Sequence, residues 1–349
     1  MNVLEKKPTT NPAAYDLYLR GLYASHKGTR EALEEAFRCF ELATQKDPTF
    51  SLAFSAWGNA HVLGLGSYLP RKETYARAKE LVARALELDP NSSEAHVARG
   101  NLALQGDLDW KTAELELRKA ISLNPGNMEA HFWYASLLAT LQRFEEGKAE
   151  VRETIRANPL MANAWIQLMG MYYHSGDIYT ATAWAEELLD RDPTSFYVRL
   201  LVGYCYATEG RTADALKMAE QLAGPPDLMN RVARAILYAL LGKPEEAGRL
   251  VSELEARAKT TYVPQVWIAN LYAVLGEKEK ALDMLERDLR EGDKGLWFDY
   301  LAPQYDSMRT DPRFVRLLRE YNLPTEMRER PLVVPHLEEG VRPVHGVPT

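Results

Sequence analysis

The 349-residue chain has only two cysteines, Cys39 and Cys205, which are too few and too far apart for a disulfide framework. Their surroundings do not match zinc-ligand spacing, so we expect both to be small core residues in a reducing compartment. Positive charge is also scarce, with 42 Lys and Arg against 49 Asp and Glu and a formal net charge of −7. A phosphate backbone is bound by clustered positive charge, so this balance argues against a nucleic-acid partner.

Long hydrophobic runs are missing as well. No window reaches the ~18 consecutive apolar residues that a membrane-spanning helix needs, so we expect no membrane partner. The opening residues MNVLEKKPTTNP contain two lysines but no apolar stretch after them, unlike a secretory signal. In the absence of such signals the expected location is the cytoplasm. The 46% apolar content nevertheless predicts a sizeable buried core.

The chain is organised by a period of roughly 34 residues. An alanine or glycine followed four positions later by an apolar residue recurs eight times, with steps of 42, 35, 34, 34, 34, 32 and 34 residues. These small residues are Ala36, Ala78, Ala113, Gly147, Ala181, Ala215, Ala247 and Ala281. Prolines keep the same spacing at Pro48, Pro90, Pro125, Pro159 and Pro193. Each proline is expected to end a helix, because it disfavours helical geometry in the residue before it.

A second helical pattern precedes each small position. It is filled by Phe54, Trp57, Gly58 and His61 in one unit and by Trp165, Leu168, Met169 and Tyr172 in another. Over about residues 12–290, the spacing and residue types resemble the tetratricopeptide repeat, a helix–turn–helix unit. The resemblance implies an all-α fold: a right-handed α-solenoid of about eight helix pairs, in which each pair buries its apolar face against its neighbours.

Four segments are expected along the chain. Residues 1–11 form an amino-terminal extension, residues 12–290 the repeat array, residues 291–323 a helical cap and residues 324–349 a Pro-rich tail. The tail is expected to be disordered; the alternative is an extended peptide that docks on the array or on a partner through Leu332-Val333-Val334.

Three local signals modify this plan. The 42-residue step predicts a projecting loop from Gly64 to Thr74, and Gly224-Pro225-Pro226 marks a shortened unit with altered curvature. In the cap, Asp311-Pro312 is a helix-start signal that precedes Phe314, Leu317, Leu318 and Tyr321 at helical spacing.

A closer resemblance covers roughly residues 11–324. The opening NPAAYDLYLRGLYASHKGTREALEEAF, the segment GDLDWKTAELELRKAISLNP and the closing GLWFDYLAPQYDSMRTDPRFVRLLREYNLP resemble the repeat-bearing carboxy-terminal halves of bacterial signalling proteins. In those proteins the array follows a winged-helix domain, a nucleotide cyclase or a protein kinase. Only about ten residues precede Asn11, so we expect no such output module here, and only a sensing or partner-binding role is carried over.

The histidines and glycines do not assemble a recognisable catalytic or metal site. His61, His96 and His131 are spaced 35 residues apart, but the nearby Glu94 and Glu129 point away from them on a helix. His96 and His131 also occupy the packing slot that Trp165 fills elsewhere, so we interpret them as hydrogen-bonded core residues. No nucleophile motif, Walker pattern or dinucleotide fingerprint is present. We therefore expect no enzymatic activity, no cofactor and no metal.

The concave groove is the remaining candidate site. In arrays of this kind the first helix of each pair lines the inner surface, and one nearly uncharged row of residues faces inward. The groove residues proposed to bind a partner are Asn59, Asn101, Phe132, Ser136, Ile166, Tyr204 and Asn270. Apolar side chains of this row would hold an apolar or aromatic extended segment, and the asparagines would hydrogen-bond its backbone. The alternative is that these residues merely pack against one another inside a tightly wound superhelix.

The sequence thus favours a non-catalytic scaffold or adaptor that binds another protein or peptide, within a bacterial signalling or assembly complex. One alternative is a regulatory sensor array in which a small ligand acts on a separate output domain. A more distant alternative is a hydrolase or metal-dependent enzyme. The sequence does not identify the partner or the oligomeric state.

Overall fold

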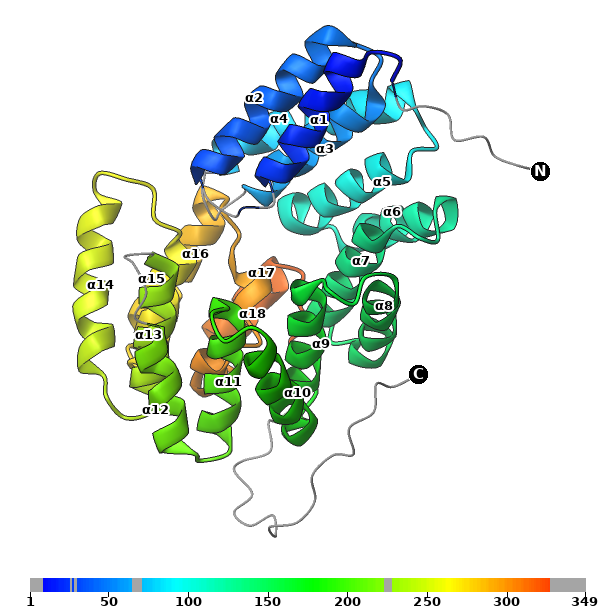
Figure 1. The fold of residues 1–349 in the computed structure, drawn as a ribbon. Coiled ribbons are helices and arrows are strands. Elements are labelled where there is room, and N and C mark those ends of the chain that lie inside the picture. Colours follow the sequence, from blue (N-terminus) through cyan, green and yellow to red (C-terminus); the bar gives the residue numbers. More distant parts are fainter. Residues whose placement is uncertain (1–8, 26, 28–29, 65–70, 223–227, 327–349) are drawn as a thin grey trace.

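The computed structural model describes residues 9–25, 27, 30–64, 71–222 and 228–326. Within these residues the secondary structure is entirely helical, and consecutive helices pack as hairpins along a curved array (Figure 1). The predicted all-α solenoid of about eight helix pairs is confirmed. The boundaries expected between extension, array, cap and tail stay a prediction.

The helices of the eight pairs have the following bounds. They are α1 (Pro12–Ser25) with α2 (Arg30–Lys46), α3 (Ser51–Leu63) with α4 (Arg71–Leu88), α5 (Ser93–Asn101) with α6 (Trp110–Leu123), α7 (Met128–Thr140) with α8 (Phe144–Ala157), α9 (Ala162–His174) with α10 (Ile178–Arg191), α11 (Phe196–Thr208) with α12 (Thr212–Gln221), α13 (Leu228–Leu240) with α14 (Glu245–Ala258), and α15 (Gln265–Val274) with α16 (Lys278–Glu291). Three further elements follow them: the short helix α17 (Leu296–Asp299), the 3-10 helix η2 (Pro303–Met308) and α18 (Pro312–Glu320).

Small residues let the helices approach closely. A Cβ added to Gly100 of α5 would lie 2.6 Å from Leu117 Cγ of α6, closer than real side chains come. Gly58 and Gly203 are equally close to Val82 and Leu237, with the nearest side-chain atom 2.7 Å away in each case. These contacts explain why glycine stands at this position of the first helices α3, α5 and α11.

Local hydrogen bonds fix where several inner helices begin. Ser92, Asn127 and Ser195 each accept a backbone N–H of the first turn through a side-chain oxygen, which marks the starts of α5, α7 and α11. Asp311 caps α18 in the same way and Pro312 follows it. The helix start expected at Asp311-Pro312 is therefore correct.

The expected irregularities are realised differently from the sequence-based prediction. A loop was expected from Gly64 to Thr74, but residues 71–74 belong to helix α4. This helix begins at Arg71 and is 18 residues long. Residues 65–70 lie outside the described part of the chain, as do Gly224-Pro225-Pro226 and the tail from 327 onward. One irregularity was not anticipated: α5 continues into a π-helical turn, η1 (Leu102–Asp107), which ends at Leu108 in the left-handed conformation.

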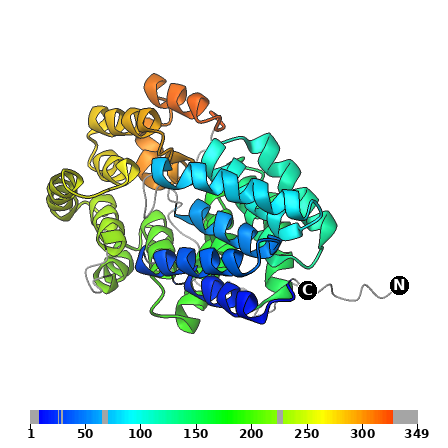
Figure 2. The same cartoon turned by 90° about the horizontal axis from the view of Figure 1, so that it is seen from above.

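The array curves until its end meets its beginning (Figure 1; Figure 2 shows the view from above). At the seam, Arg71 at the start of α4 donates from Nη1 to the carbonyl oxygen of Gly292, just after α16, at 3.0 Å. The Arg71 backbone N–H lies 3.4 Å from Asp293 Oδ1. Contacts between residues more than 220 positions apart thus close the solenoid into a ring.

The segment after α16 contacts helices from the other side of the ring. Tyr300 donates to the carbonyl oxygen of Thr140 at the end of α7 at 2.5 Å. Trp110 Nε1 donates to the carbonyl oxygen of Asn322 at 2.6 Å, and Asn322 Nδ2 donates to that of Leu108 at 3.3 Å. The side chains of Tyr300, Tyr305 and Phe314 are fully buried in the same core as α9–α16. The expected cap therefore also fills part of the concave side.

The close approach of α5 and α6 predicts opposite effects for two glycine-to-alanine changes. Gly100→Ala should destabilise the protein by about 1–2 kcal/mol, because overpacking against Leu117 outweighs the gain in helix propensity. Gly248→Ala in α14 is the matched control: nothing lies within 4 Å of its Cβ position, so it should stabilise by about 0.5–1 kcal/mol. Urea unfolding followed by circular dichroism measures both. Equal effects of the two changes would contradict this packing argument.

Candidate functional site

His96 and His131 occupy the same position in their repeats as Trp165 and make similar hydrogen bonds. In His96 and His131, Nδ1 lies 2.6 Å from a glutamate of the following helix, Glu116 or Glu150. The Nε2 atom of each lies 3.0 Å from the carbonyl oxygen of the proline six residues earlier. Trp165 donates from Nε1 to the equivalent proline carbonyl at 2.9 Å. The interpretation of His96 and His131 as hydrogen-bonded packing residues is thus supported directly by their contacts.

His61 has a different environment. Its ring stacks on Phe37 with centroids 4.0 Å apart, and it lies close to Trp57. Burial lowers the pKa of His61 to about 4, with a smaller contribution from the nearby charge of Arg77. His61 is therefore a neutral core residue at neutral pH.

Other site chemistries have little support in the described residues. No group of three or more His, Cys, Asp or Glu there is arranged to hold a metal ion. Cys39 and Cys205 are both free and buried, as expected of small core residues. None of the helices in the described ranges has the length and hydropathy to cross a membrane.

The amino-terminal part of the predicted groove is closed by its own polar contacts. Asn101 is fully buried and donates from Nδ2 to Asn59 Oδ1 at 2.9 Å. Asn59 in turn donates to Glu129 Oε1 at 2.7 Å. The asparagines that were expected to face a peptide backbone therefore link α3, α5 and α7 to one another.

The carboxy-terminal part of the predicted groove is covered by the chain itself. Asn270 is buried; its Nδ2 donates to Asp299 Oδ2 at 2.9 Å and its Oδ1 accepts from the Tyr305 hydroxyl at 2.6 Å. Tyr204 is also buried, and its ring stacks with that of Tyr173. The expectation that the whole row faces an open groove needs correction: Asn101, Tyr204 and Asn270 are enclosed in this conformation.

The middle of the row remains accessible. Phe132 and Ser136 of α7 and Ile166 of α9 are half-buried, and nothing lies within 4 Å of a Cβ placed on Gly170. Gln167 crosses from α9 to α7, donating from Nε2 to Ser136 Oγ at 2.6 Å. Whether Asn59, Phe132, Ser136 and Ile166 bind a partner stays a prediction.

Two residues of α11 extend this accessible surface. Leu200 is half-buried and Tyr197 is 44% exposed. Tyr197 was not among the residues expected in the groove. The spacing of Tyr197, Leu200 and Tyr204, at i, i+3 and i+7 on one helix face, was the signal that could have found it. We call the six residues Phe132, Ser136, Ile166, Gly170, Tyr197 and Leu200 the middle groove.

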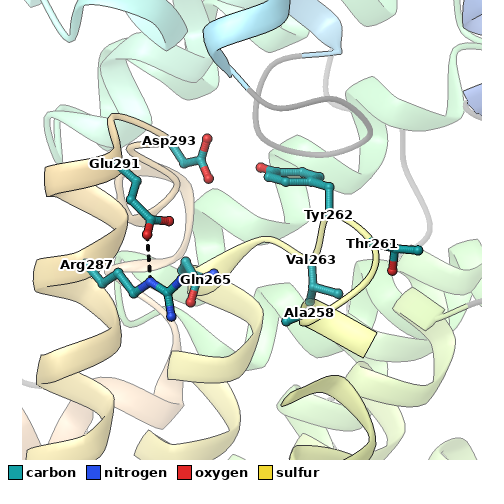
Figure 3. A pocket seen from close by; sticks show the side chains of 8 residues that line it. All are labelled: Ala258, Thr261, Tyr262, Val263, Gln265, Arg287, Glu291 and Asp293. Atoms are coloured by element: carbon teal, nitrogen blue, oxygen red, sulfur yellow. Dashed lines mark hydrogen bonds and ion pairs between the residues drawn. The ribbon is translucent and has the colours of Figure 1, made fainter. Parts of the chain in front are cut away.

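A separate polar cavity of about 250 Å³ lies near the ring seam (Figure 3). Its lining residues are Ala258, Thr261, Tyr262, Val263, Gln265, Arg287, Glu291 and Asp293. Arg287 Nε and Glu291 Oε1 are 2.7 Å apart, so their charges offset each other, and the Tyr262 ring points toward Asp293. Burial raises the pKa of Asp293 above its ordinary value. The cavity offers hydrogen-bonding groups to a small polar molecule.

No family model matches the chain. Among curated proteins it is 22% identical over 235 residues to superkiller protein 3 of Schizosaccharomyces pombe, covering 65% of this chain and 16% of that protein. It is 36% identical over 91 residues to the type IV pilus assembly protein PilF of Pseudomonas aeruginosa, covering 26% of this chain and 35% of that protein. The chain spans well under half the length of these relatives.

Among solved structures, the tetratricopeptide-repeat protein Tom70 of yeast matches 91% of this chain and 70% of its own, with a TM-score of 0.51 and 15% identity. The chain has the tetratricopeptide-repeat fold. This agreement covers the helix pairs and their stacking. At this identity the likeness extends to the fold alone.

The histidine contacts of this repeat array predict a pH-dependent stability. The hydrogen bond to Glu150 raises the pKa of His131 above its ordinary 6.5. A histidine whose pKa is higher in the folded than in the unfolded protein stabilises the fold below about pH 6.5. This stabilisation is lost as the pH rises through the pKa of the folded state. His131→Trp, which copies Trp165 and keeps a donor for the Pro125 carbonyl, should therefore lose more stability at about pH 5.5 than at about pH 8.5. Urea midpoints at the two pH values measure this.

His61→Phe provides a control of opposite sign. Because the pKa of His61 is lowered to about 4, its neutral form stabilises the fold above about pH 6.5, and this contribution falls as the pH drops toward 4. Phenylalanine keeps the stacking on Phe37 without titrating, so this variant should gain stability relative to the parent protein at about pH 5. If both variants show the same pH trend, the assignments are wrong.

Proposed function

We propose that the chain is a non-catalytic protein–protein interaction scaffold that binds an apolar or aromatic peptide segment in its middle groove. The observation that carries this proposal is that uncharged residues at corresponding places on three first helices of consecutive pairs, α7, α9 and α11, are partly exposed. Burial of such a surface is favourable by roughly 25 cal/mol per Å². Gly170 leaves space between the larger side chains, so that a partner's side chain can enter there.

The chain's own carboxy-terminal segment supports the choice of ligand chemistry. Tyr300 and Tyr305 lie against the adjoining inner surface, with their hydroxyls bonded to Thr140 and Asn270. Trp297 packs in the same region against residues of both large core clusters. An aromatic segment thus already fits the part of the inner face next to the middle groove.

We place this scaffold within a bacterial signalling or assembly complex. The name of PilF refers to pilus assembly, and the similar 91-residue stretch is part of that longer protein. The repeat-bearing halves of signalling proteins that the sequence resembles point in the same direction. A cytoplasmic location belongs to this proposal as well.

The proposal predicts the outcome of a peptide selection. Peptides selected from a random display library on the full chain should be rich in Phe, Trp, Tyr and Leu. The double variant Phe132→Ala with Ile166→Ala should weaken the selected peptide at least about 10-fold, because it removes two apolar contacts from the centre of the site. Fluorescence anisotropy of the labelled peptide measures the affinity.

Leu160→Ala is the matched control for this experiment. Leu160 is 92% exposed and lies in the turn before α9, outside the middle groove, so its removal should leave the affinity unchanged. Selected peptides that are mainly charged, or that bind the double variant as tightly as the parent protein, would contradict the proposed site.

A second candidate function is a sensor of a small polar ligand. The observation that favours it is the cavity of about 250 Å³, because its lining residue Asp293 also meets the Arg71 backbone at the seam (Figure 3). A ligand bound there would act on the contact that closes the ring. A screen of small polar molecules by thermal shift tests this candidate, and Asp293→Asn should abolish any shift that arises in this cavity.

A further inference from the structure

The two ends of the repeat array differ in how they meet solvent. At the carboxy-terminal end, α18 buries Phe314, Leu317 and Leu318 against the last pair. Its outward side carries Arg313 and Arg316, both of which form ion pairs with Glu286. This end is therefore finished with a charged surface, as a solenoid terminus requires for solubility.

The amino-terminal end carries an apolar stripe instead. Tyr15, Leu19 and Tyr23 of α1 are 39%, 47% and 71% exposed. They are spaced four residues apart, so they lie along one face of the helix. Figure 1 shows α1 as the first described helix of the array, beside α2 and α3.

The repeat register shows that two of the three stripe positions, Leu19 and Tyr23, correspond to buried positions elsewhere in the array. A Cβ on Gly21 would lie 2.5 Å from Phe40, just as one on Gly100 would lie 2.6 Å from Leu117, so Gly21 and Gly100 are equivalent. Tyr23 then corresponds to Leu102, which is 1% exposed.

The equivalent position is buried by the preceding helix pair. Leu102 packs in one cluster with Val62 and Ala78 of the pair before it. Among the described residues, α1 has no preceding pair, yet it keeps large apolar side chains where the interior units contact a neighbour. The stripe therefore has the composition of an interface rather than of a solvated end.

The order of residues in the stripe identifies the occupant. The residue order Tyr15, Leu19, Tyr23 is the same in both directions. With a two-fold axis at Leu19, the Leu19 side chains of the two copies therefore contact each other, and Tyr15 of each copy contacts Tyr23 of the other. An isologous contact requires this self-complementarity.

One ion pair beside the stripe is also self-complementary, while Lys27 lies over the Tyr23 ring with its Nζ 4.6 Å from the ring centroid. Asp16 and Arg20 form an ion pair at 3.2 Å on one flank of α1. With the two-fold axis at Leu19, Asp16 of one copy and Arg20 of the other lie on the same flank, offset by two residues or about 3 Å along the helices. Each acid can thus pair with the base of either copy, and the interface carries no net charge from this pair.

We propose that the stripe of Tyr15, Leu19 and Tyr23 joins two copies of this chain through antiparallel packing of their α1 helices. This dimer leaves the middle groove of each copy on separate inner surfaces. The dimer proposal is therefore independent of the proposed peptide binding, and an experiment can contradict one of the two proposals without contradicting the other.

Light scattering coupled to size exclusion, at loading concentrations from about 1 to 100 µM, tests the proposal. The full chain should run as a dimer at the upper end of this range. Leu19→Glu should weaken the dimer at least about 100-fold, because it buries an unpaired charge at the centre of the contact. Leu115→Glu, at a 68% exposed leucine of α6 outside the stripe, should leave the dimer intact.

A cysteine at the axis tests the geometry directly. Leu19→Cys should form a disulfide-linked dimer under mild oxidation, since only residues at the axis meet their own copies, whereas Leu115→Cys should not. The native Cys39 and Cys205 are buried and provide a low background. A monomer at all concentrations, a dimer that survives Leu19→Glu, or absence of the Leu19→Cys cross-link would each overturn the proposal. A monomer would result if residues 1–8 or a different protein covered the stripe.

Discussion

The close contact between a glycine on one helix and a large apolar residue on another is the constraint on which the rest of the structure depends. Gly58, Gly100 and Gly203 each leave less than 3 Å between a would-be Cβ and the opposing side chain. Such contacts set the distance and angle between helices, because protein interiors have no spare volume to absorb a change. In a solenoid these angles add from unit to unit, so they decide where the last pair arrives.

The ring follows from this accumulated curvature. The last pair arrives near α4, where Arg71 meets Gly292 and Asp293, and the segment beyond it is directed into the concave side. There the Tyr300 hydroxyl donates to the carbonyl oxygen of Thr140, and the carbonyl oxygen of Asn322 accepts from Trp110 Nε1. Such bonds satisfy groups that burial would otherwise leave unpaired.

Much of this architecture was predictable from the sequence, because it is local. The period of roughly 34 residues predicts the helix pairs. Residues such as Asn127 and Asp311 indicate where helices begin, because their side chains cap the first turn. The shared slot of His131 and Trp165 was predictable because the period aligns them. By contrast, the enclosure of Asn270 by Asp299 and Tyr305 was not, since no periodic signal says that a later segment folds back inside. Tyr197 was missed because it lies outside the row of residues that was expected to face inward.

Because the carboxy-terminal segment fills part of the inner face, the free-energy cost of binding a partner differs along that face. Displacing the carboxy-terminal segment would expose Tyr300, Tyr305 and Phe314, each worth about 1.5–3 kcal/mol of burial, and would break the hydrogen bonds to Thr140 and Asn270. A ligand with micromolar affinity has a binding free energy of roughly 8 kcal/mol, and the cost of this displacement would offset most of it. Docking on Phe132 and Ile166, which are already partly exposed, requires no such rearrangement. Phe132 and Ile166 are therefore among the residues of the predicted row that a partner can contact while the carboxy-terminal segment stays in place.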